Sequence, residues 1–569
     1  MRKLFISITV VLFALSAAFR ADACTNVIIT RGASADGSNM ISYAADSHWL
    51  YGELYFSKAA KWKPGTMLKI TEWDSYRPLG EIAQVEKTFQ TVGNMNEHQL
   101  IIAETTWGGR EEQMDPEGIM DYGSLIYVTL QRATTAREAI DMIVSLASEY
   151  GYPSEGETFS IADKDEAWVM DLVGKGDKEK GIVWVARRIP DGYICAHANQ
   201  ARITTFPLDD PDNCIYAEDV ITFARKCGYF SGEDAEFSFR DAYNPMDFSG
   251  ARGCDARAWS AFNILCDGVF TYEENGSEVS RPAADWLDYA MGYDLAGEMP
   301  LFVKPSRKIT PKDVADVMRD HYEGTPMDMT QDIGAGGNAL PYRWRPMNFV
   351  VDGKKYVNER AIATQQTGFW FVAQSRGWLP DQIGALVWFG TDDAATSYLT
   401  PIYVNTKKVP ECFRVGNGNL LEYSPTSSFW VNNRISNACY KMYNQMAPFV
   451  REAIDRFENE QMFDKVKAND EKLLKLFNSK KLFRKYRIRK ALTDYTVGTA
   501  QQQFSLWQKL EETLLVKFID GNVKAQAEDG SFLHSKDYKG LPDGLTQPGY
   551  TEKWKECVVK DAGSVLMSK

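Results

Sequence analysis

The chain has 569 residues, of which 44% are hydrophobic and 12% are aromatic. A chain of this length and composition can bury a sizeable core, so large-scale disorder is not expected. The 64 Lys and Arg residues against 77 Asp and Glu residues give a formal net charge of -13. This charge repels a phosphate backbone, so nucleic acid is not expected as a partner.

The first 23 residues are typical of an export signal. Arg2 and Lys3 form a basic tip, an apolar run extends over residues 4–19, and Ala21-Asp22-Ala23 is a small-x-small cleavage site. The run is short for a membrane span, and no later stretch is apolar for long enough to cross a bilayer. We therefore expect a periplasmic or extracellular protein that begins at Cys24 and contacts a membrane only if Cys24 carries a lipid.

The elements of the first half follow in chain order. Short apolar or β-branched runs bounded by turn residues predict strands at 25–30, 40–43, 104–107 and 166–172. Apolar side chains at helical spacing predict an amphipathic helix over residues 136–150. The turn Ile189-Pro190-Asp191-Gly192 between the runs 183–186 and 193–196 predicts a β-hairpin.

The second half changes character along its length. Two further strands are predicted at 369–374 and 383–389, and long charged helices follow at 434–459, 464–477 and 501–518. This order of strands and helices predicts a layered α+β body. We expect a leader over residues 1–23, a catalytic domain over residues 24–430 and a helical C-terminal region over residues 431–569, packed on or beside the core.

Cysteine and histidine usage does not favour a metal site. Setting Cys24 aside, eight cysteines remain, and their low density predicts isolated thiols with at most one disulfide. No CxxC occurs, and the five histidines are never spaced i, i+4. The GxSxG and HExxH motifs of serine and zinc hydrolases are absent. Neither a metal nor an organic cofactor is expected.

Cys24 carries unusual chemistry if it begins the mature chain. Its thiol has a reference pKa of about 8.5 and its α-amine one of about 7.7 to 8.0, so the amine can take the thiol proton. Removal of the leader, by a signal peptidase or by autoprocessing, would then activate the protein. Two other interpretations stay open. In the first, Cys24 is the lipid acceptor of a lipoprotein, and its acylated amine cannot act as a base. In the second, Cys24 is an ordinary buried cysteine.

Eight short blocks occur in a characteristic order between Cys24 and the 440s. They are 24–29 (CTNVII), 32–38 (GASADGS), 44–48 (AADSH), 163–171 (DKDEAWVMD), 184–189 (WVARRI), 197–203 (HANQARI), 255–263 (DARAWSAFN) and 388–390 (WFG). This arrangement resembles the bacterial cysteine dipeptidases of the peptidase D type, in the N-terminal-nucleophile hydrolase superfamily.

The resemblance implies a four-layer αββα sandwich and hydrolysis of dipeptides with a free amino end, through a thioester on Cys24. Small peptides are then the expected partners, and the sequence leaves open whether the chain forms a homo-oligomer. Penicillin and bile-salt acylases are similar in fold and nucleophile. A linear-amide acylase is therefore the alternative within the same class, and a non-catalytic surface lipoprotein is the alternative outside it.

The resemblance also implies roles for residues near the nucleophile. Asn199 matches the asparagine that donates to the oxyanion, and Asp46 matches an acidic residue that orients the α-amine. Without the resemblance, Asn199 fits a turn and Asp46 fits a cap equally well. Relatives commonly carry an arginine three residues before this aspartate, where this chain has Tyr43. We expect Tyr43 to affect substrate binding, and its presence puts an ion pair at the site in doubt.

Three more residues are candidates for the site. Arg257 offers a fork of donors that could orient the nucleophile or bind a substrate carboxylate, although a surface salt bridge is an equal alternative and Arg252 is close by. Glu104 and Trp107 resemble the lining of a substrate pocket, where a carboxylate binds a substrate ammonium. Their other interpretation is a structural sheet edge.

Overall fold

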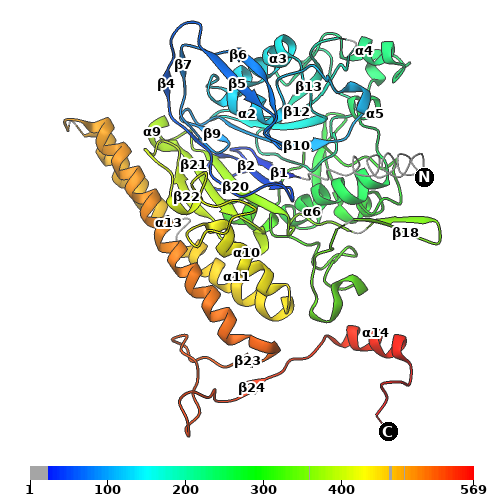
Figure 1. Ribbon diagram of the computed structural model, residues 1–569. Helices are drawn as coiled ribbons and strands as arrows, with labels where there is room; N and C mark the ends of the chain where they lie inside the picture. Colours follow the sequence, from blue (N-terminus) through cyan, green and yellow to red (C-terminus); the bar gives the residue numbers. More distant parts are fainter. Residues whose placement is uncertain are drawn as a thin grey trace, which may run out of the picture.

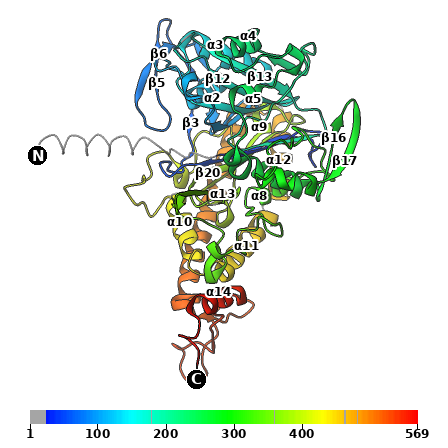
Figure 2. The same cartoon turned by 90° about the vertical axis from the view of Figure 1, so that its right-hand side faces the viewer.

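The computed structural model describes residues 24–177, 179–345, 347–357, 359–460, 464–479 and 481–568. The leader predicted over residues 1–23 lies outside them. The described chain is an α+β protein in which two large sheets face each other and helices cover their outer faces (Figures 1 and 2). Among the described residues, no helix combines the length and the apolar composition that a membrane span requires.

The first sheet has six strands, all paired antiparallel in the order β14-β1-β2-β20-β21-β22. Their bounds are β1 (Thr25–Ile29), β2 (Asn39–Asp46), β14 (Ile194–His197), β20 (Thr367–Ser375), β21 (Ala385–Thr391) and β22 (Thr400–Tyr403). In the turn between β1 and β2, the carboxylate of Asp36 accepts hydrogen bonds from the Ser38 backbone N–H at 3.0 Å and the Ser34 hydroxyl at 2.8 Å. The strand, turn and strand predicted after Cys24 are confirmed.

The second sheet has eight strands in the order β15-β13-β12-β11-β10-β9-β8-β3. Their bounds are β3 (Phe56–Ser57), β8 (Thr91–Val92), β9 (Met95–Asn96), β10 (Ile101–Trp107), β11 (Gly156–Ala162), β12 (Ala167–Gly174), β13 (Ile182–Arg188) and β15 (Cys214–Tyr216). Every residue of β11 and β12 is buried, because one face meets the first sheet and the other meets helices. The strands predicted at 104–107 and 166–172 are β10 and β12.

The hairpin predicted around residues 189–192 is wrong. Strand β13 pairs with β12 and β15 in the eight-stranded sheet, whereas β14 pairs with β1 in the six-stranded sheet. The turn residues bond to the loop after β1: Gly192 N–H donates to the Thr30 hydroxyl at 3.0 Å, and Asp191 accepts from Gly32 N–H at 2.6 Å. The turn therefore carries the chain from one sheet to the other, because each flanking strand finds its partners elsewhere.

Helices α2 (Tyr122–Leu130) and α3 (Ala136–Tyr150) cover the outer face of the eight-stranded sheet (Figure 1). The bounds of α3 confirm the predicted helix. It begins at Thr135, whose hydroxyl accepts from the backbone N–H of Glu138, and it buries the apolar face that the spacing indicated.

The outer face of the six-stranded sheet packs against a larger set of helices. They are α6 (Ala256–Leu265), α8 (Pro311–Val317), α12 (Val466–Asn478) and the first half of α13 (Arg484–Lys517). Helices α10 (Ser428–Cys439) and α11 (Tyr443–Glu460) and the second half of α13 bury their apolar residues in the cluster that also contains the inner faces of the two sheets. The helix predicted over 434–459 is two helices, because the chain turns between Cys439 and Tyr443. In this turn the hydroxyl of Tyr440 donates a hydrogen bond to the buried carboxylate of Asp393 at 2.9 Å. The helix predicted over 501–518 is the second half of α13, which runs diagonally along the molecule (Figure 1).

The remaining elements lie around these layers. The helices are α4 (Val220–Cys227), α5 (Phe239–Tyr243), α7 (Leu287–Ala290), α9 (Asp381–Gly384) and α14 (Glu552–Ala562). The two-stranded ribbons are β4 (Ala60–Lys61) with β7 (Lys87–Thr88), β5 (Met67–Thr71) with β6 (Pro78–Ala83), β16 (Val269–Glu274) with β17 (Ser277–Pro282), β18 (Asn348–Val351) with β19 (Lys354–Val357), and β23 (Val523–Lys524) with β24 (Leu545–Thr546). All nine cysteines lie among the described residues and are free thiols.

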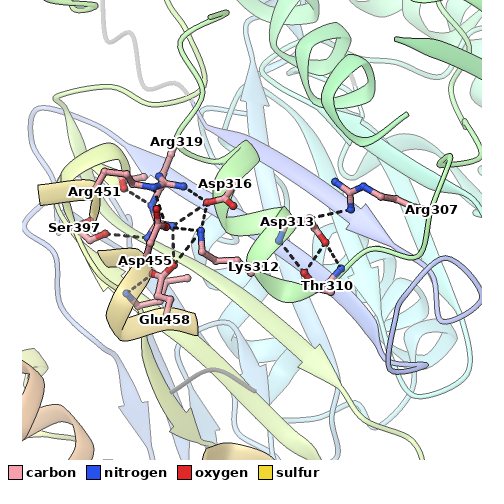
Figure 3. A network of polar contacts seen from close by, with 12 residues as sticks. Arg307, Thr310, Lys312, Asp313, Asp316, Arg319, Ser397, Arg451, Asp455 and Glu458 are labelled. Atoms are coloured by element: carbon pink, nitrogen blue, oxygen red, sulfur yellow. Dashed lines mark hydrogen bonds and ion pairs between the residues drawn. The ribbon is translucent and has the colours of Figure 1, made fainter. Parts of the chain in front are cut away.

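A charged cluster joins the C-terminal helices to the body, and we call it the helix cluster (Figure 3). It contains three cations and three carboxylates: Lys312, Arg319, Arg451, Asp316, Asp455 and Glu458. Arg319 donates to both carboxylate oxygens of Glu458, at 2.9 and 2.6 Å, and its other donors reach two backbone carbonyls. The helix cluster thus links α8 to α11 with matched charges.

Candidate active site

The registers of β1 place two polar residues beside Cys24. Cys24 immediately precedes β1, and Thr25 lies opposite Ala44 in β2, so Cys24 lies beside the end of β2 at Asp46. On the other side, Asn26 lies opposite His197 in β14. Because the two strands are antiparallel, Cys24, two residues before Asn26, comes next to Asn199, two residues after His197. The antiparallel pairing of three strands therefore brings these residues to one place.

The thiol of Cys24 faces the eight-stranded sheet. Its Sγ lies 3.5 Å from Oε1 of Glu104 on β10 and 3.6 Å from the hydroxyl of Tyr43 on β2. The Tyr43 hydroxyl donates to the same carboxylate oxygen of Glu104. Burial raises the pKa of the Cys24 thiol well above its ordinary value, and the negative charges of Glu104 and Asp46 raise it further. The thiol is therefore protonated at neutral pH and needs a base to become a nucleophile.

Arg257 in the first turn of α6 holds the backbone around Cys24. It is buried, and its five N–H groups all donate hydrogen bonds at 2.6 to 3.3 Å, to the carbonyl oxygens of Gly253, Cys24 and Ala198, the hydroxyl of Thr25 and the amide oxygen of Asn199. A guanidinium has five donors, so none is left for a substrate carboxylate. Arg252, the sequence alternative to Arg257, pairs with Glu359 at 2.8 Å instead.

Asn199 presents its amide nitrogen towards the site. Its backbone has a φ of 57°, a left-handed conformation that asparagine tolerates. Arg257 donates to Oδ1 at 2.8 Å, and Nδ2 donates to the carbonyl of Thr106 at 2.5 Å. Because an amide nitrogen carries two hydrogens, one N–H has no acceptor among the described residues. The residue is partly exposed, so this N–H can meet a substrate oxygen.

Asp46 forms an ion pair that the sequence did not predict. Its buried carboxylate accepts from the guanidinium of Arg360 and, at 2.7 Å, from the hydroxyl of Thr367. Burial raises the pKa of Asp46, and the charge of Arg360 opposes this rise. The doubt that Tyr43 raised is thus resolved: an arginine does pair with Asp46, but it comes from a loop 314 residues further along the chain.

Arg345 is a third arginine near Asp46, and no sequence motif pointed to it. Its Nε donates to the side-chain oxygen of Gln366 at 3.0 Å, and Gln366 in turn donates to the backbone oxygen of Asp46 at 3.3 Å. Among the described residues, no carboxylate lies within 4.0 Å of the Arg345 guanidinium. We call Arg257, Arg345, Arg360 and Asp46 the arginine cluster.

A second carboxylate lies close to Glu104. Thr106 on β10 lies opposite Glu157 on β11, and its hydroxyl lies 3.5 Å from Oε2 of Glu104 and 3.2 Å from Oε2 of Glu157. Both carboxylates are buried. Burial raises the pKa of Glu157 well above its ordinary value, and the adjacent charge of Glu104 raises it further. Glu157 therefore holds its proton more tightly than a free glutamate does.

Two other residues from the predicted site region have structural contacts. The ring of Trp107 is buried against Gly109 and Gly156, and its indole N–H donates to the Thr158 hydroxyl at 3.1 Å. His197 lies between the sheets, with its ring nitrogens 2.7 Å from the hydroxyls of Thr105 and Ser160. Burial lowers the pKa of His197 to about 3, so its ring is neutral and joins the sheets without a charge.

The structure thus brings Cys24, Tyr43, Asp46, Glu104, Asn199 and Arg257 together. It adds Glu157, Arg345 and Arg360, which sequence reasoning missed. Glu157 lies on β11, a strand that was not predicted from the sequence. The two arginines lie in irregular segments without periodicity, and no pattern in the sequence identified them.

Comparisons with known proteins identify the family of this chain. A family model described as peptidase family C69 matches residues 23–456. "Probable dipeptidase B" of Lactococcus lactis subsp. lactis is 24% identical over 73% of this chain and 80% of its own length. "Dipeptidase A" of Lactobacillus helveticus is 22% identical over 81% of this chain and 90% of its own length, and "Probable dipeptidase" of Latilactobacillus sakei is 23% identical over 69% and 76%. The chain therefore belongs to peptidase family C69 and is a hydrolase of peptide bonds.

Proposed function

We propose that this protein is an exported dipeptidase whose mature chain begins at Cys24 and which hydrolyses dipeptides through a thioester on that residue. The observation that carries the proposal is the set of contacts around the thiol: a carboxylate at 3.5 Å and an oriented asparagine amide next along the sheet. The names of the relatives support the substrate class. We also propose the four-layer αββα arrangement of the N-terminal-nucleophile hydrolases, with a catalytic domain over residues 24–430 and a helical region over residues 431–569.

The α-amine of the processed Cys24 is the proposed base. In the unprocessed chain this nitrogen is an amide and cannot take a proton, so removal of the leader would switch the activity on. The raised pKa of the thiol makes such a base necessary. Asp46 and its partner Arg360 would hold the local charges that orient the amine.

The proposed reaction has two halves. The amine takes the thiol proton, Sγ attacks the peptide carbonyl, and the oxyanion accepts the remaining N–H of Asn199. The C–N bond breaks as the ammonium of Cys24 returns the proton to the leaving nitrogen, which releases the C-terminal amino acid. Water then attacks the thioester while the amine takes its proton. The C–S bond breaks, the sulfur regains a proton, and the N-terminal amino acid is released.

The acidic wall beside the thiol favours a substrate with a free ammonium group. Glu104 and Glu157 together would bind the α-ammonium of a dipeptide, since a buried carboxylate pair gains a cation at little cost in solvation. An acylated amino acid carries no charge at this position. This is the feature that distinguishes a dipeptidase from the alternative, a linear-amide acylase.

The test compares three forms of the protein on two substrates. The exported chain, a cytosolic form with Met retained before Cys24, and the same form after removal of that Met are assayed on a dipeptide panel and on N-acyl amino acids. We expect hydrolysis of dipeptides only, by the two forms that begin with Cys24. Activity of the Met-retained form would assign the base to Glu104 instead. Preference for N-acyl amino acids would support the acylase.

Intact mass of the mature N-terminus tests the remaining alternative. A free Cys24 amine is expected for an enzyme in the periplasm or outside the cell. A lipid adduct on this residue, with an acylated amine, would contradict the proposed base and indicate a surface lipoprotein.

A further inference from the structure

The charges around Asp46 do not balance. Three guanidinium groups, those of Arg257, Arg345 and Arg360, act on one carboxylate. Arg360 pairs directly with Asp46, and the neighbouring Arg252 and Glu359 balance each other. Two positive charges of the arginine cluster therefore have no matching carboxylate among the described residues.

The two unmatched arginines differ in what they can still bind. Arg257 is buried and has used all five donors on neutral acceptors, so it cannot receive a ligand. Arg345 is partly exposed, and among the described residues its guanidinium donates from Nε and Nη2 to a single acceptor, the side-chain oxygen of Gln366. Only Arg345 is thus open to a carboxylate from solution.

Arg345 keeps its charge at neutral pH. Burial and the adjacent charge of Arg360 lower its pKa to about 10, which still leaves the guanidinium protonated. A narrow cavity of about 10 Å³ is lined by Arg345, Arg360 and Thr364, and also by Glu359, whose carboxylate pairs with Arg252. This space holds one small group, such as a water molecule or a carboxylate oxygen, and excludes a side chain.

The path from Arg345 to the nucleophile is short. Gln366 bridges Arg345 to the backbone oxygen of Asp46, and the backbone N–H of Asp46 contacts the Cys24 thiol. The cation therefore approaches Cys24 from the six-stranded sheet, whereas Glu104 approaches it from the eight-stranded sheet. Cys24 therefore lies between the carboxylate of Glu104 on one side and the guanidinium of Arg345 on the other.

We propose that Arg345 binds the C-terminal carboxylate of the substrate and thereby restricts cleavage to dipeptides. This inference rests on the proposed function. In a dipeptide the carboxylate belongs to the residue directly after the cleaved bond. One additional residue would move it by about 3.5 Å, beyond hydrogen-bond reach of a side chain anchored by Gln366. Arg345 is a specificity-determining residue in this scheme, and the chemistry stays with Cys24.

The test measures kcat and KM for a dipeptide and for its C-terminal amide. The probe is the dipeptide that the processed wild-type enzyme hydrolyses fastest in a panel. We expect the wild type to prefer the free carboxylate on the order of 10- to 100-fold in kcat/KM, mainly through KM. In Arg345→Gln, kcat/KM for the dipeptide should fall by this 10- to 100-fold factor, while kcat/KM for the amide should stay unchanged. The variant should therefore hydrolyse the dipeptide and the amide equally well. Arg345→Lys should recover part of the preference, since a point charge remains but the fork of donors is lost.

Arg456→Gln is the matched control. Arg456 is exposed on α11, and its one ion pair among the described residues is with Glu452 one turn away. Its replacement therefore changes the net charge equally and should leave both rates unchanged. A binding measurement by calorimetry on Cys24→Ala, with and without Arg345→Gln, gives the same comparison without turnover. Equal losses of Arg345→Gln on dipeptide and amide, or no loss on either, would overturn the inference while dipeptide hydrolysis stands. Failure of the wild type to hydrolyse any dipeptide would instead reject the proposed function.

Discussion

The helix cluster and the arginine cluster are both highly charged, partly buried and built from segments far apart in the chain, but their charges are arranged differently. The helix cluster sets three cations against three carboxylates, and Arg319 and Glu458 meet through two hydrogen bonds (Figure 3). The arginine cluster sets three cations against Asp46 alone. Unmatched buried charge is costly, so its presence beside Cys24 points to a ligand that supplies the missing negative charge.

The difference separates stability from activity. Matched charges that join α8 to α11 should affect folding when one partner is removed, because the other is left buried without compensation. Unmatched charges beside the nucleophile should affect binding and catalysis first. Each of the following experiments breaks or sharpens this distinction.

Replacing Cys24 removes the atom around which the arginine cluster is arranged. Cys24→Ala should lower kcat/KM of the processed enzyme for dipeptides by more than about 10³-fold, and Cys24→Ser should retain a trace of activity, because a hydroxyl is the weaker nucleophile. Thermal unfolding should be unchanged, since the contacts of the thiol with Glu104 and Tyr43 are long, at 3.5 and 3.6 Å. Full activity of the alanine variant would refute Cys24 as the nucleophile.

Glu458→Gln breaks the helix cluster. Arg319 would remain buried with only the half-exposed Asp316, at 3.6 Å, as a charged partner, so we expect a loss of about 3 kcal/mol in the free energy of unfolding, the lower end of the range for a broken buried pair. The kcat of the folded fraction should stay at the wild-type value. Glu452→Gln, at an exposed position of the same helix, should change the free energy of unfolding by less than about 0.5 kcal/mol. A loss of kcat in Glu458→Gln at full folding would remove the distinction between the two clusters.

Arg360→Gln removes the direct partner of Asp46. We expect kcat/KM to fall on the order of 10- to 100-fold, as for the loss of a charge-assisted hydrogen bond. Burial already raises the pKa of Asp46 and Arg360 lowers it, so without Arg360 the pKa rises further. If ionised Asp46 is required, the acid limb of the rate profile must move to higher pH in the variant. An acid limb at the wild-type position would show that the charge of Asp46 is not needed.

His197 provides a neutral reference against the charged clusters. Burial lowers its pKa to about 3, whereas the unfolded chain binds a proton below about pH 6.5. Acidification from pH 6.5 towards pH 4 therefore favours the unfolded chain, by about 1.4 kcal/mol per pH unit from this residue. The free energy of unfolding, measured by denaturant titration at several pH values, should depend on pH more steeply in the wild type than in His197→Gln, by this amount per pH unit. Parallel slopes would mean that His197 titrates in the folded protein.

The part of the candidate site that depends on local sequence pattern and on strand pairing could be predicted from the sequence. Cys24, Asp46 and Asn199 lie at the ends of three strands whose composition is clear in the sequence, and antiparallel pairing brings such ends together. Arg360 and Arg345 lie in irregular loops, so neither period nor turn chemistry marks them. Trp107 shows the opposite failure: it ends a predicted strand, but its ring is buried against glycines of neighbouring segments that only the packing reveals.

The sequence by itself determined the leader prediction, the position of Cys24 at the start of a strand, helix α3 and the α+β class, because these depend on composition and on periods of two or 3.6 residues. The tertiary structure decided which sheet each strand joins, as β13 and β14 show. It also decided which charges meet, since Asp46 and Arg360 are 314 residues apart and pair only once both sheets and their loops have assembled. Long-range electrostatic partners depend on the packed arrangement of the whole chain, and no local segment encodes them.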